Sequence, residues 1–171
     1  MSTISDSIQA KCLAFGDRII KLNDYLLEQA ASKMYDVVSS KSDVGGRWSK
    51  HQTSSVKHQT SSAIHQPSNI KHHTSRVPVH LQSVAALANQ LLRSGTSIGA
   101  NNAEATSAIS KADFKSKSYI ALKEARESLY WLELLHRNNY LTDVQFNSLY
   151  GDCEELVKVL THRCKKLDEV K

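Results

Sequence analysis

Glutamate, histidine and cysteine are the residue types here that could do chemistry, and their spacing decides which chemistry is open to them. Glu133 and His136 form a Glu-x-x-His pair, which is the spacing used by carboxylate-bridged di-iron sites in helical bundles. Such a site needs a second pair of the same kind, but no glutamate lies three residues before His162. The sequence therefore does not predict a metal oxidase.

Histidines also recur every seven residues, at His51, His58, His65 and His72, in a segment rich in Ser, Thr and Gln. Imidazoles in such a segment could bind zinc or nickel loosely, but the pattern lacks the fixed ligand geometry of a selective site. We find no Gly-rich phosphate loop, paired catalytic carboxylates or nucleophile–His–acid pattern either. We therefore predict no metal, no cofactor and no enzymatic reaction.

Long amphipathic helices are the elements that must position these residues. Apolar residues recur at alternating intervals of three and four. They predict helices at about residues 5–34, 81–109, 111–137 and 143–169. Both prolines, Pro67 and Pro78, fall between the first and second of these ranges, so no predicted helix contains a helix breaker. We expect an all-α, antiparallel up-down-up-down four-helix bundle that forms one domain over residues 1–171.

The starts of the third and fourth helices carry local signals of their own. Ser110 and Asp113 have the spacing of a helix N-cap, and Ile109 is placed to pack against Phe114 as a hydrophobic staple. The same arrangement recurs at Thr142, Gln145, Leu141 and Phe146. The Asn138-Asn139 pair between the two helices suits a left-handed helix end. The expected core includes Leu91, Ile98, Leu122, Leu129, Leu132, Leu149, Leu156 and Leu160.

The histidine repeat belongs to a predicted insert at about residues 39–80, between the first two helices. Its units lack the paired apolar positions of a coiled coil, and its composition cannot form a core, so we expect most of it to be disordered. A tandem repeat of seven nucleotides, expanded in frame, is our hypothesis for its origin. Of the 22 basic and 17 acidic residues, six basic and one acidic fall between Val37 and Ser83. The rest of the chain holds 16 of each and is neutral overall.

The three cysteines, Cys12, Cys153 and Cys164, each fall on an apolar helical stripe. An odd number at such positions is typical of buried, reduced thiols in a cytoplasmic protein. No apolar run approaches the roughly 20 residues of a membrane span, and the N-terminus lacks a signal-peptide pattern. We therefore expect a cytoplasmic location and no membrane partner.

The stretch QLLRSGTSIGANNAEA, residues 90–105, contains two glycines inside a helical pattern. Each costs about 1 kcal/mol relative to alanine. Gly95, Gly99 and Ala103 lie one turn apart, and so predict close packing, either against a helix of the same bundle or against another subunit. Asn102 falls within the apolar stripe. A buried asparagine needs hydrogen-bond partners and could fix helix register or oligomeric state.

This stretch resembles the signature of the 23S rRNA intervening-sequence protein family. The resemblance extends to KADF at residues 111–114, ALKEARESLYWLELL at residues 121–135, and Glu154-Glu155-Leu156. The insert is not expected to be part of the family pattern. The resemblance implies a bacterial four-helix bundle that assembles as a homopentamer. Some family members are encoded within ribosomal RNA genes, and relatives serve as accessory proteins of diversity-generating retroelements, where they bind nucleic acid and a reverse transcriptase.

The resemblance also singles out polar residues of the signature. These match the family's characteristic arginine, serine, asparagine and glutamate, and are Arg93, Ser97, Asn101 and Glu104. They could contact a ligand directly, or form salt bridges and hydrogen bonds between helices or subunits. The third helix adds basic candidates for a nucleic-acid surface, namely Lys111, Lys115, Lys123 and Arg126. A solvated helix face is the alternative for those four residues.

Two functions follow as hypotheses. The first is a non-catalytic, oligomeric accessory protein that binds structured RNA or DNA, together with a reverse transcriptase if the retroelement relatives are the guide. The second is an adaptor that binds only protein. Phosphate binding needs clustered positive charge and weakens steeply with salt, so the neutral charge of the predicted bundle weakens the first hypothesis. Titration of structured RNA and DNA at two salt concentrations distinguishes the two.

Overall fold

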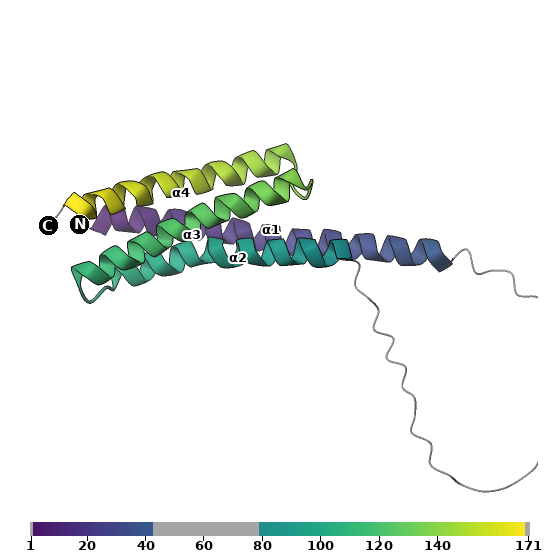
Figure 1. The fold of residues 1–171 in the computed structure, drawn as a ribbon, viewed down its shortest axis with the longest axis horizontal. Helices are drawn as coiled ribbons and strands as arrows, with labels where there is room; N and C mark the ends of the chain where they lie inside the picture. The colour runs from purple at the N-terminus through teal and green to yellow at the C-terminus, as the bar shows by residue number, and fades with distance from the viewer. Residues whose placement is uncertain (1, 43–78, 170–171) are drawn as a thin grey trace, which may run out of the picture.

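The fold is an antiparallel four-helix bundle (Figure 1). A computed structural model describes residues 2–42 and 79–169, and the side chains of residues 7–33 and 82–169. Its elements are the helices α1 (Ser2–Ser42), α2 (Val79–Thr106), α3 (Lys111–Arg137) and α4 (Asp143–Glu169). The described residues contain no strand. Successive helices run up and down the bundle, which confirms the expected fold class, and the far end of α1 projects beyond the other three (Figure 1).

The predicted helix bounds are confirmed for α3 and α4, whereas the first two helices differ from prediction. Helix α1 continues to Ser42 rather than ending near residue 34, so residues 39–42 of the predicted insert are helical. Helix α2 ends at Thr106 rather than near residue 109. The remainder of the predicted insert, residues 43–78, lies outside the described residues.

The early end of α2 overturns one expectation about the core. Ile109 lies in the turn after α2 and is 95% exposed, so the predicted staple between Ile109 and Phe114 is wrong. The backbone N–H of Ser107 donates to the carbonyl of Glu104 at 3.1 Å, which tightens the end of the helix. The N–H of Ile109 then donates to the Asp113 carboxylate at 3.2 Å. This local bond holds Ile109 in the turn, where its side chain faces solvent.

The predicted helix caps are present. The Ser110 hydroxyl accepts a hydrogen bond from the Asp113 N–H at 3.1 Å. At the start of α4, the Thr142 N–H donates to the Gln145 side chain at 3.0 Å, and the Gln145 N–H donates back to the Thr142 hydroxyl at 3.3 Å. Asn139 has φ of 58°, in the left-handed region that asparagine tolerates better than most residues. Each helix start is therefore set by its own local sequence.

The core occupies the centre of the bundle, between all four helices. Seven of the eight predicted core residues are buried, and Leu129 is partly buried and packs against them. Helix α1 contributes a full apolar stripe, which consists of Ile8, Cys12, Phe15, Ile19, Leu22, Leu26 and Ala30. Polar pairs join α1 to α4 at the surface: Lys11 pairs with Glu155 at 2.7 Å, and Arg18 pairs with Asp152.

Candidate nucleic-acid interface

Two of the three small residues of the signature, Gly95 and Gly99, lie where α2 crosses α1. A Cβ atom added to Gly95 would lie 3.1 Å from Cγ1 of Ile19, and one added to Gly99 would lie 3.4 Å from Cβ of Cys12. Ala103, one turn further along α2, is exposed. The two glycines therefore allow close approach of α1 and α2 within one chain, and Ala103 does not share in that contact.

Asn102 lies at the centre of a buried polar network. Its side chain is fully buried, its Nδ2 donates to Oε1 of Gln9 at 2.5 Å, and its Oδ1 accepts from Nη1 of Arg163 at 2.7 Å. The Arg163 guanidinium also lies 5.7 Å from the centre of the Phe114 ring. Burial lowers the pKa of Arg163. The expected partners of Asn102 thus come from α1 and α4 of the same chain.

The polar members of the signature lie on the outer side of α2, and intrachain bonds use most of them. Glu104 forms an ion pair with Lys117 of α3. Asn101 donates to the carbonyl of Ser97 at 2.9 Å. Arg93 is exposed and, among the described residues, donates one long hydrogen bond, 3.4 Å, to Gln90. No single ligand-binding arrangement is formed by these four residues.

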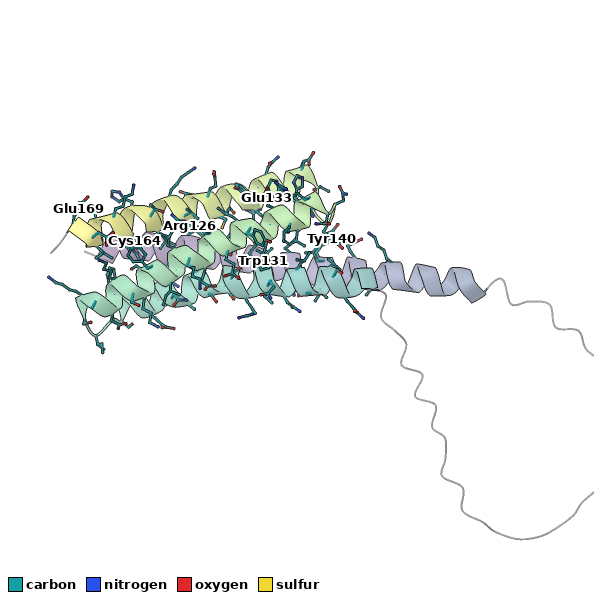
Figure 2. All side chains as sticks on the ribbon, in the orientation of Figure 1. Arg126, Trp131, Glu133, Tyr140, Cys164 and Glu169 are labelled. Atoms are coloured by element: carbon teal, nitrogen blue, oxygen red, sulfur yellow. The ribbon has the colours of Figure 1, made fainter. Side chains whose placement is uncertain are left out.

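The basic candidates of α3 separate into two places. Lys111 and Lys115 line a cavity of about 560 Å³ beside the turn between α2 and α3. Lys123 and Arg126 line a second hollow of about 350 Å³ between α3 and α4, together with Lys165. Figure 2 shows the labelled Arg126 and Cys164 where α3 and α4 run side by side.

We call this second hollow the α3/α4 groove. It is lined by Tyr119, Leu122, Lys123, Arg126, Thr161, Cys164 and Lys165. Two cations near the groove are paired with carboxylates, since Lys115 binds Asp168 at 2.7 Å and Lys158 binds Glu154 at 3.2 Å. Within residues 7–33 and 82–169, by contrast, Lys123, Arg126 and Lys165 have no ion-pair partner. The groove is therefore a local concentration of uncompensated positive charge on a chain whose helices are neutral overall.

One edge of the groove is held by a hydrogen-bonded triad. The Tyr119 hydroxyl donates to Oδ2 of Asp168 at 2.6 Å, while Lys115 binds Oδ1 of the same carboxylate at 2.7 Å. These two bonds lower the pKa of Asp168, and the bond to Asp168 raises the pKa of Tyr119. The phenol is thus kept as a protonated donor, and its ring is held at the rim.

Lys165 is the basic groove residue that the sequence did not predict, and Tyr119 was not predicted as a site residue either. Lys165 lies beside Cys164 on α4, whereas the basic residues predicted for a nucleic-acid surface all lie on α3. Because Lys165 directly follows Cys164 of the apolar stripe, the sequence does place it at the edge of the buried face of α4. Which flank of α4 faces α3 depends on how the helices pack, and helical periodicity does not specify that.

The Glu-x-x-His pair on α3 is used for contacts within the chain. Glu133 pairs with Arg137 at 2.5 Å, and Nε2 of His136 lies 2.8 Å from Oδ1 of Asp143. The His136 ring also stacks on Phe146, with 4.2 Å between ring centres. The side chains that the structure describes contain no group of three His, Cys, Asp or Glu residues able to hold a metal ion.

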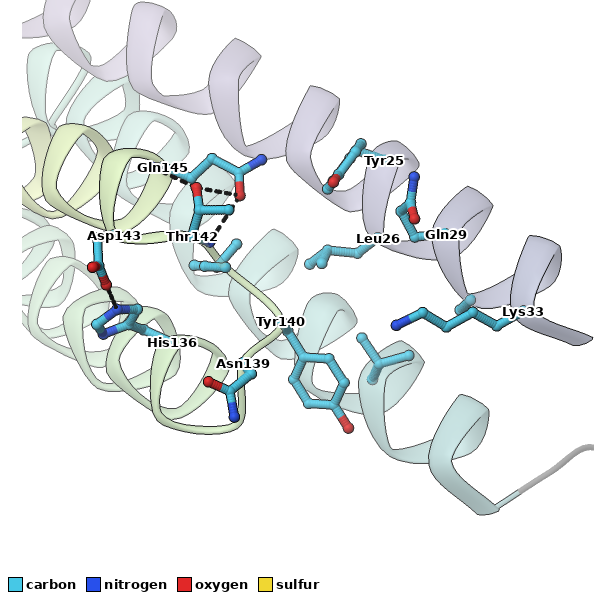
Figure 3. Close-up of a pocket in the computed structure, with 13 residues that line it drawn as sticks. Tyr25, Leu26, Gln29, Lys33, His136, Asn139, Tyr140, Thr142, Asp143 and Gln145 are labelled. Carbon is cyan, nitrogen blue, oxygen red and sulfur yellow. Dashed lines mark hydrogen bonds and ion pairs between the residues drawn. The ribbon is translucent and has the colours of Figure 1, made fainter.

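A third hollow, of about 490 Å³, lies where the turn between α3 and α4 meets α1 and α2 (Figure 3). Its labelled lining includes Tyr25, Gln29, Lys33 and Tyr140, with His136 and Asp143 joined to each other at one side. The described lining includes one lysine, Lys33, and the Asp143 carboxylate engages the His136 ring. As for membranes, none of the helices in the described ranges has the length and apolarity to span one.

Comparison with known proteins agrees with the fold. The model of the family described as 23S rRNA-intervening sequence protein matches residues 52–162. That range includes residues 52–80, so the expectation that the whole insert lies outside the family pattern is wrong for those residues. No match was found among curated proteins.

A solved structure supports the same assignment. It is a protein of unknown function from the S23 ribosomal protein family of Bacteroides thetaiotaomicron VPI-5482, and it is 31% identical to this chain with a TM-score of 0.63. The similarity covers 95% of this chain and 99% of that one. On the strength of these two matches, the chain belongs to the 23S rRNA-intervening sequence protein family.

Proposed function

We propose that this protein is a non-catalytic nucleic-acid-binding protein and that the α3/α4 groove is its binding surface. One observation carries the proposal: Lys123, Arg126 and Lys165 gather around one hollow, and none of them has an ion-pair partner in the described part of the chain. Lysine and arginine side chains are the usual ligands of nucleic-acid phosphates. A cation that is already paired with a carboxylate gains less binding free energy from a phosphate. The three unpaired cations are therefore the strongest candidates for phosphate binding.

Family membership supports a role connected with nucleic acid, because the family's name refers to an intervening sequence of 23S rRNA. The four polar signature residues do not strengthen this role, since Glu104 and Asn101 are engaged within the chain. We therefore place the interface on α3 and α4 rather than on the signature of α2.

Self-association would strengthen binding by a surface of three charges, because repeated weak contacts act together. Helix α1 carries an exposed apolar stripe at seven-residue intervals, in which Leu13 is 60%, Ile20 is 45% and Leu27 is 36% exposed. Residues seven apart lie on one side of a helix. We propose that this stripe joins copies of the chain; a pentamer remains a prediction from the family resemblance.

The same stripe supports the alternative function, an adaptor that binds only protein. An exposed row of large apolar side chains is a feature of protein-binding surfaces. A reverse transcriptase could be the protein partner under either function. Like the pentamer, that partner remains a prediction.

Fluorescence anisotropy with a labelled structured RNA and a DNA duplex tests the proposal, at about 50 and about 200 mM salt. The triple variant Lys123→Gln, Arg126→Gln, Lys165→Gln removes the groove charges. The matched control Lys21→Gln, Lys33→Gln, Lys166→Gln removes the same charge from exposed residues elsewhere on α1 and α4. Each lost phosphate contact reduces the magnitude of the slope of log affinity against log salt by about 0.9. The slope of the groove variant should therefore be smaller in magnitude than the wild-type slope by about two to three.

The control variant should keep most of the wild-type slope. Equal losses in the two variants would show that net charge matters and the groove does not. If the wild type binds neither the structured RNA nor the duplex, or binds both without salt dependence, the adaptor is favoured.

A further inference from the structure

The α3/α4 groove differs from a simple phosphate-binding surface because the bottom of the hollow is apolar. Leu122 and Cys164 are buried at 5% and 2% exposure, and the ring of Tyr119, which is 40% exposed, lies at the side. The three cations surround this apolar hollow. Its volume of about 350 Å³ is within the range of small-molecule sites. The groove thus combines a cationic rim with an apolar pocket of the size that a planar ring could enter.

A continuous duplex cannot use both features. Its phosphates would meet the cations, but its bases are stacked inside, so nothing apolar would enter the hollow. A single strand exposes the faces of its bases, and such bases commonly stack on aromatic side chains while cations contact the neighbouring phosphates. The arrangement of rim and floor therefore matches an unstacked nucleotide better than it matches a duplex.

Tyr119 is preorganised for such stacking. Its hydroxyl is bonded to Asp168, and Asp168 is held in turn by Lys115. The contact at the outer end of the side chain fixes the ring beside the hollow before any ligand arrives, which reduces the entropy lost on binding.

We propose that the α3/α4 groove accommodates an unpaired nucleobase, so that the bound nucleic acid is single-stranded at this point. The inference rests on the proposed function and specifies its ligand. Lys123, Arg126 and Lys165 contact the phosphates on either side, and the base enters the hollow beside Tyr119 and over Leu122.

Three RNA probes of equal length, about 12 nucleotides, test this by fluorescence anisotropy on the full chain. They are a single strand, its perfect duplex and an abasic strand, which retains the phosphates but has no bases. We expect the single strand to bind at least about tenfold more tightly than the other two. Equal affinity of the abasic strand and the single strand would overturn the inference.

Two variants of one residue locate the effect. Tyr119→Ser removes the ring and should weaken binding of the single strand at least about fivefold, with the abasic strand unaffected. Tyr119→Phe retains the ring, loses the bond to Asp168, and should keep most of the preference for the single strand. Thermal unfolding of both variants checks the fold, and because the abasic strand reports the charges alone, its unchanged affinity shows that the groove is intact.

The outcomes distinguish this inference from the proposed function. If the duplex and the abasic strand bind as tightly as the single strand, and the groove triple variant weakens all three, the proposed function holds and the nucleobase inference is wrong. If none of the probes binds in a salt-dependent way, the proposed function itself is wrong.

Discussion

Oδ1 of Asn102 on α2 accepts a hydrogen bond from the Arg163 guanidinium on α4 at 2.7 Å, although these two helices lie on a diagonal of the bundle and do not pack directly on each other. The bond spans the core between α1 and α3. Together with the bond from Asn102 to Gln9, it joins three of the four helices in one polar network. A buried network of this kind favours the one packing arrangement that satisfies all its members.

Removing the centre of this network should be costly. Asn102→Leu leaves the Arg163 guanidinium and the Gln9 side chain without their partner, and we expect the free energy of unfolding to fall by about 1–3 kcal/mol. The matched control is Asn101→Ala, because within the described part of the chain the Asn101 side chain bonds to the carbonyl of Ser97 in its own helix. Urea denaturation measures both variants, and an equal loss in the two would refute a special role for Asn102.

The two glycines Gly95 and Gly151 should respond in opposite directions to alanine. A Cβ at Gly151 meets nothing within 4 Å, so the better helix propensity of alanine should stabilise α4 by up to about 1 kcal/mol. A Cβ at Gly95 would lie 3.1 and 3.2 Å from the γ carbons of Ile19, a buried and branched side chain. We expect Gly95→Ala to destabilise the protein by about 1–2 kcal/mol. Denaturation midpoints give the comparison, and a stabilised Gly95→Ala would mean that α1 can shift away.

The thiols should be unreactive in the folded protein and should make stability depend on pH. Burial raises the pKa of Cys12 to about 11 and that of Cys153 to about 12, from an ordinary value of 9.0. Because the folded state holds the proton more tightly, the stabilising contribution is complete below pH 9 and is lost as pH rises toward 11–12. Reaction with a disulfide reagent at pH 8 should be slow until denaturant is added, after which all three cysteines should react. Fast labelling of the native chain would contradict their burial.

Disrupting the exposed apolar stripe of α1, which consists of Leu13, Ile20 and Leu27, should reduce self-association. Ile20→Lys places a charge at the centre of the row formed with Leu13 and Leu27, and should lower the mass of the particle in solution. The control Ala14→Lys adds the same charge at an exposed position of α1 outside the stripe. Size-exclusion chromatography with light scattering measures the mass. A wild-type monomer, or an unchanged mass for Ile20→Lys, would show that copies do not assemble through this face.

Most of the fold could be predicted from sequence, whereas the candidate site could be predicted only in part. Apolar periodicity located the helices and nearly all the core, and the signals at Ser110 and Thr142 located the starts of α3 and α4. The error at Ile109 arose because the apolar pattern continues past Thr106, while the turn that ends α2 is closed by the Asp113 carboxylate. Lys123 and Arg126 were identified as basic candidates, but their neighbour Lys165 was not.

What the sequence by itself determined is therefore local: which segments are helical, where the capped helices begin, and which stripe of each helix is buried. These properties depend on residues three or four positions apart. Only the tertiary structure decided that Gly95 meets Ile19, that Asn102 meets Arg163, and that Lys165 joins Lys123 and Arg126 around one groove. Contacts between residues far apart in the chain depend on which flank of each helix faces which neighbour, and packing of the whole core sets that choice.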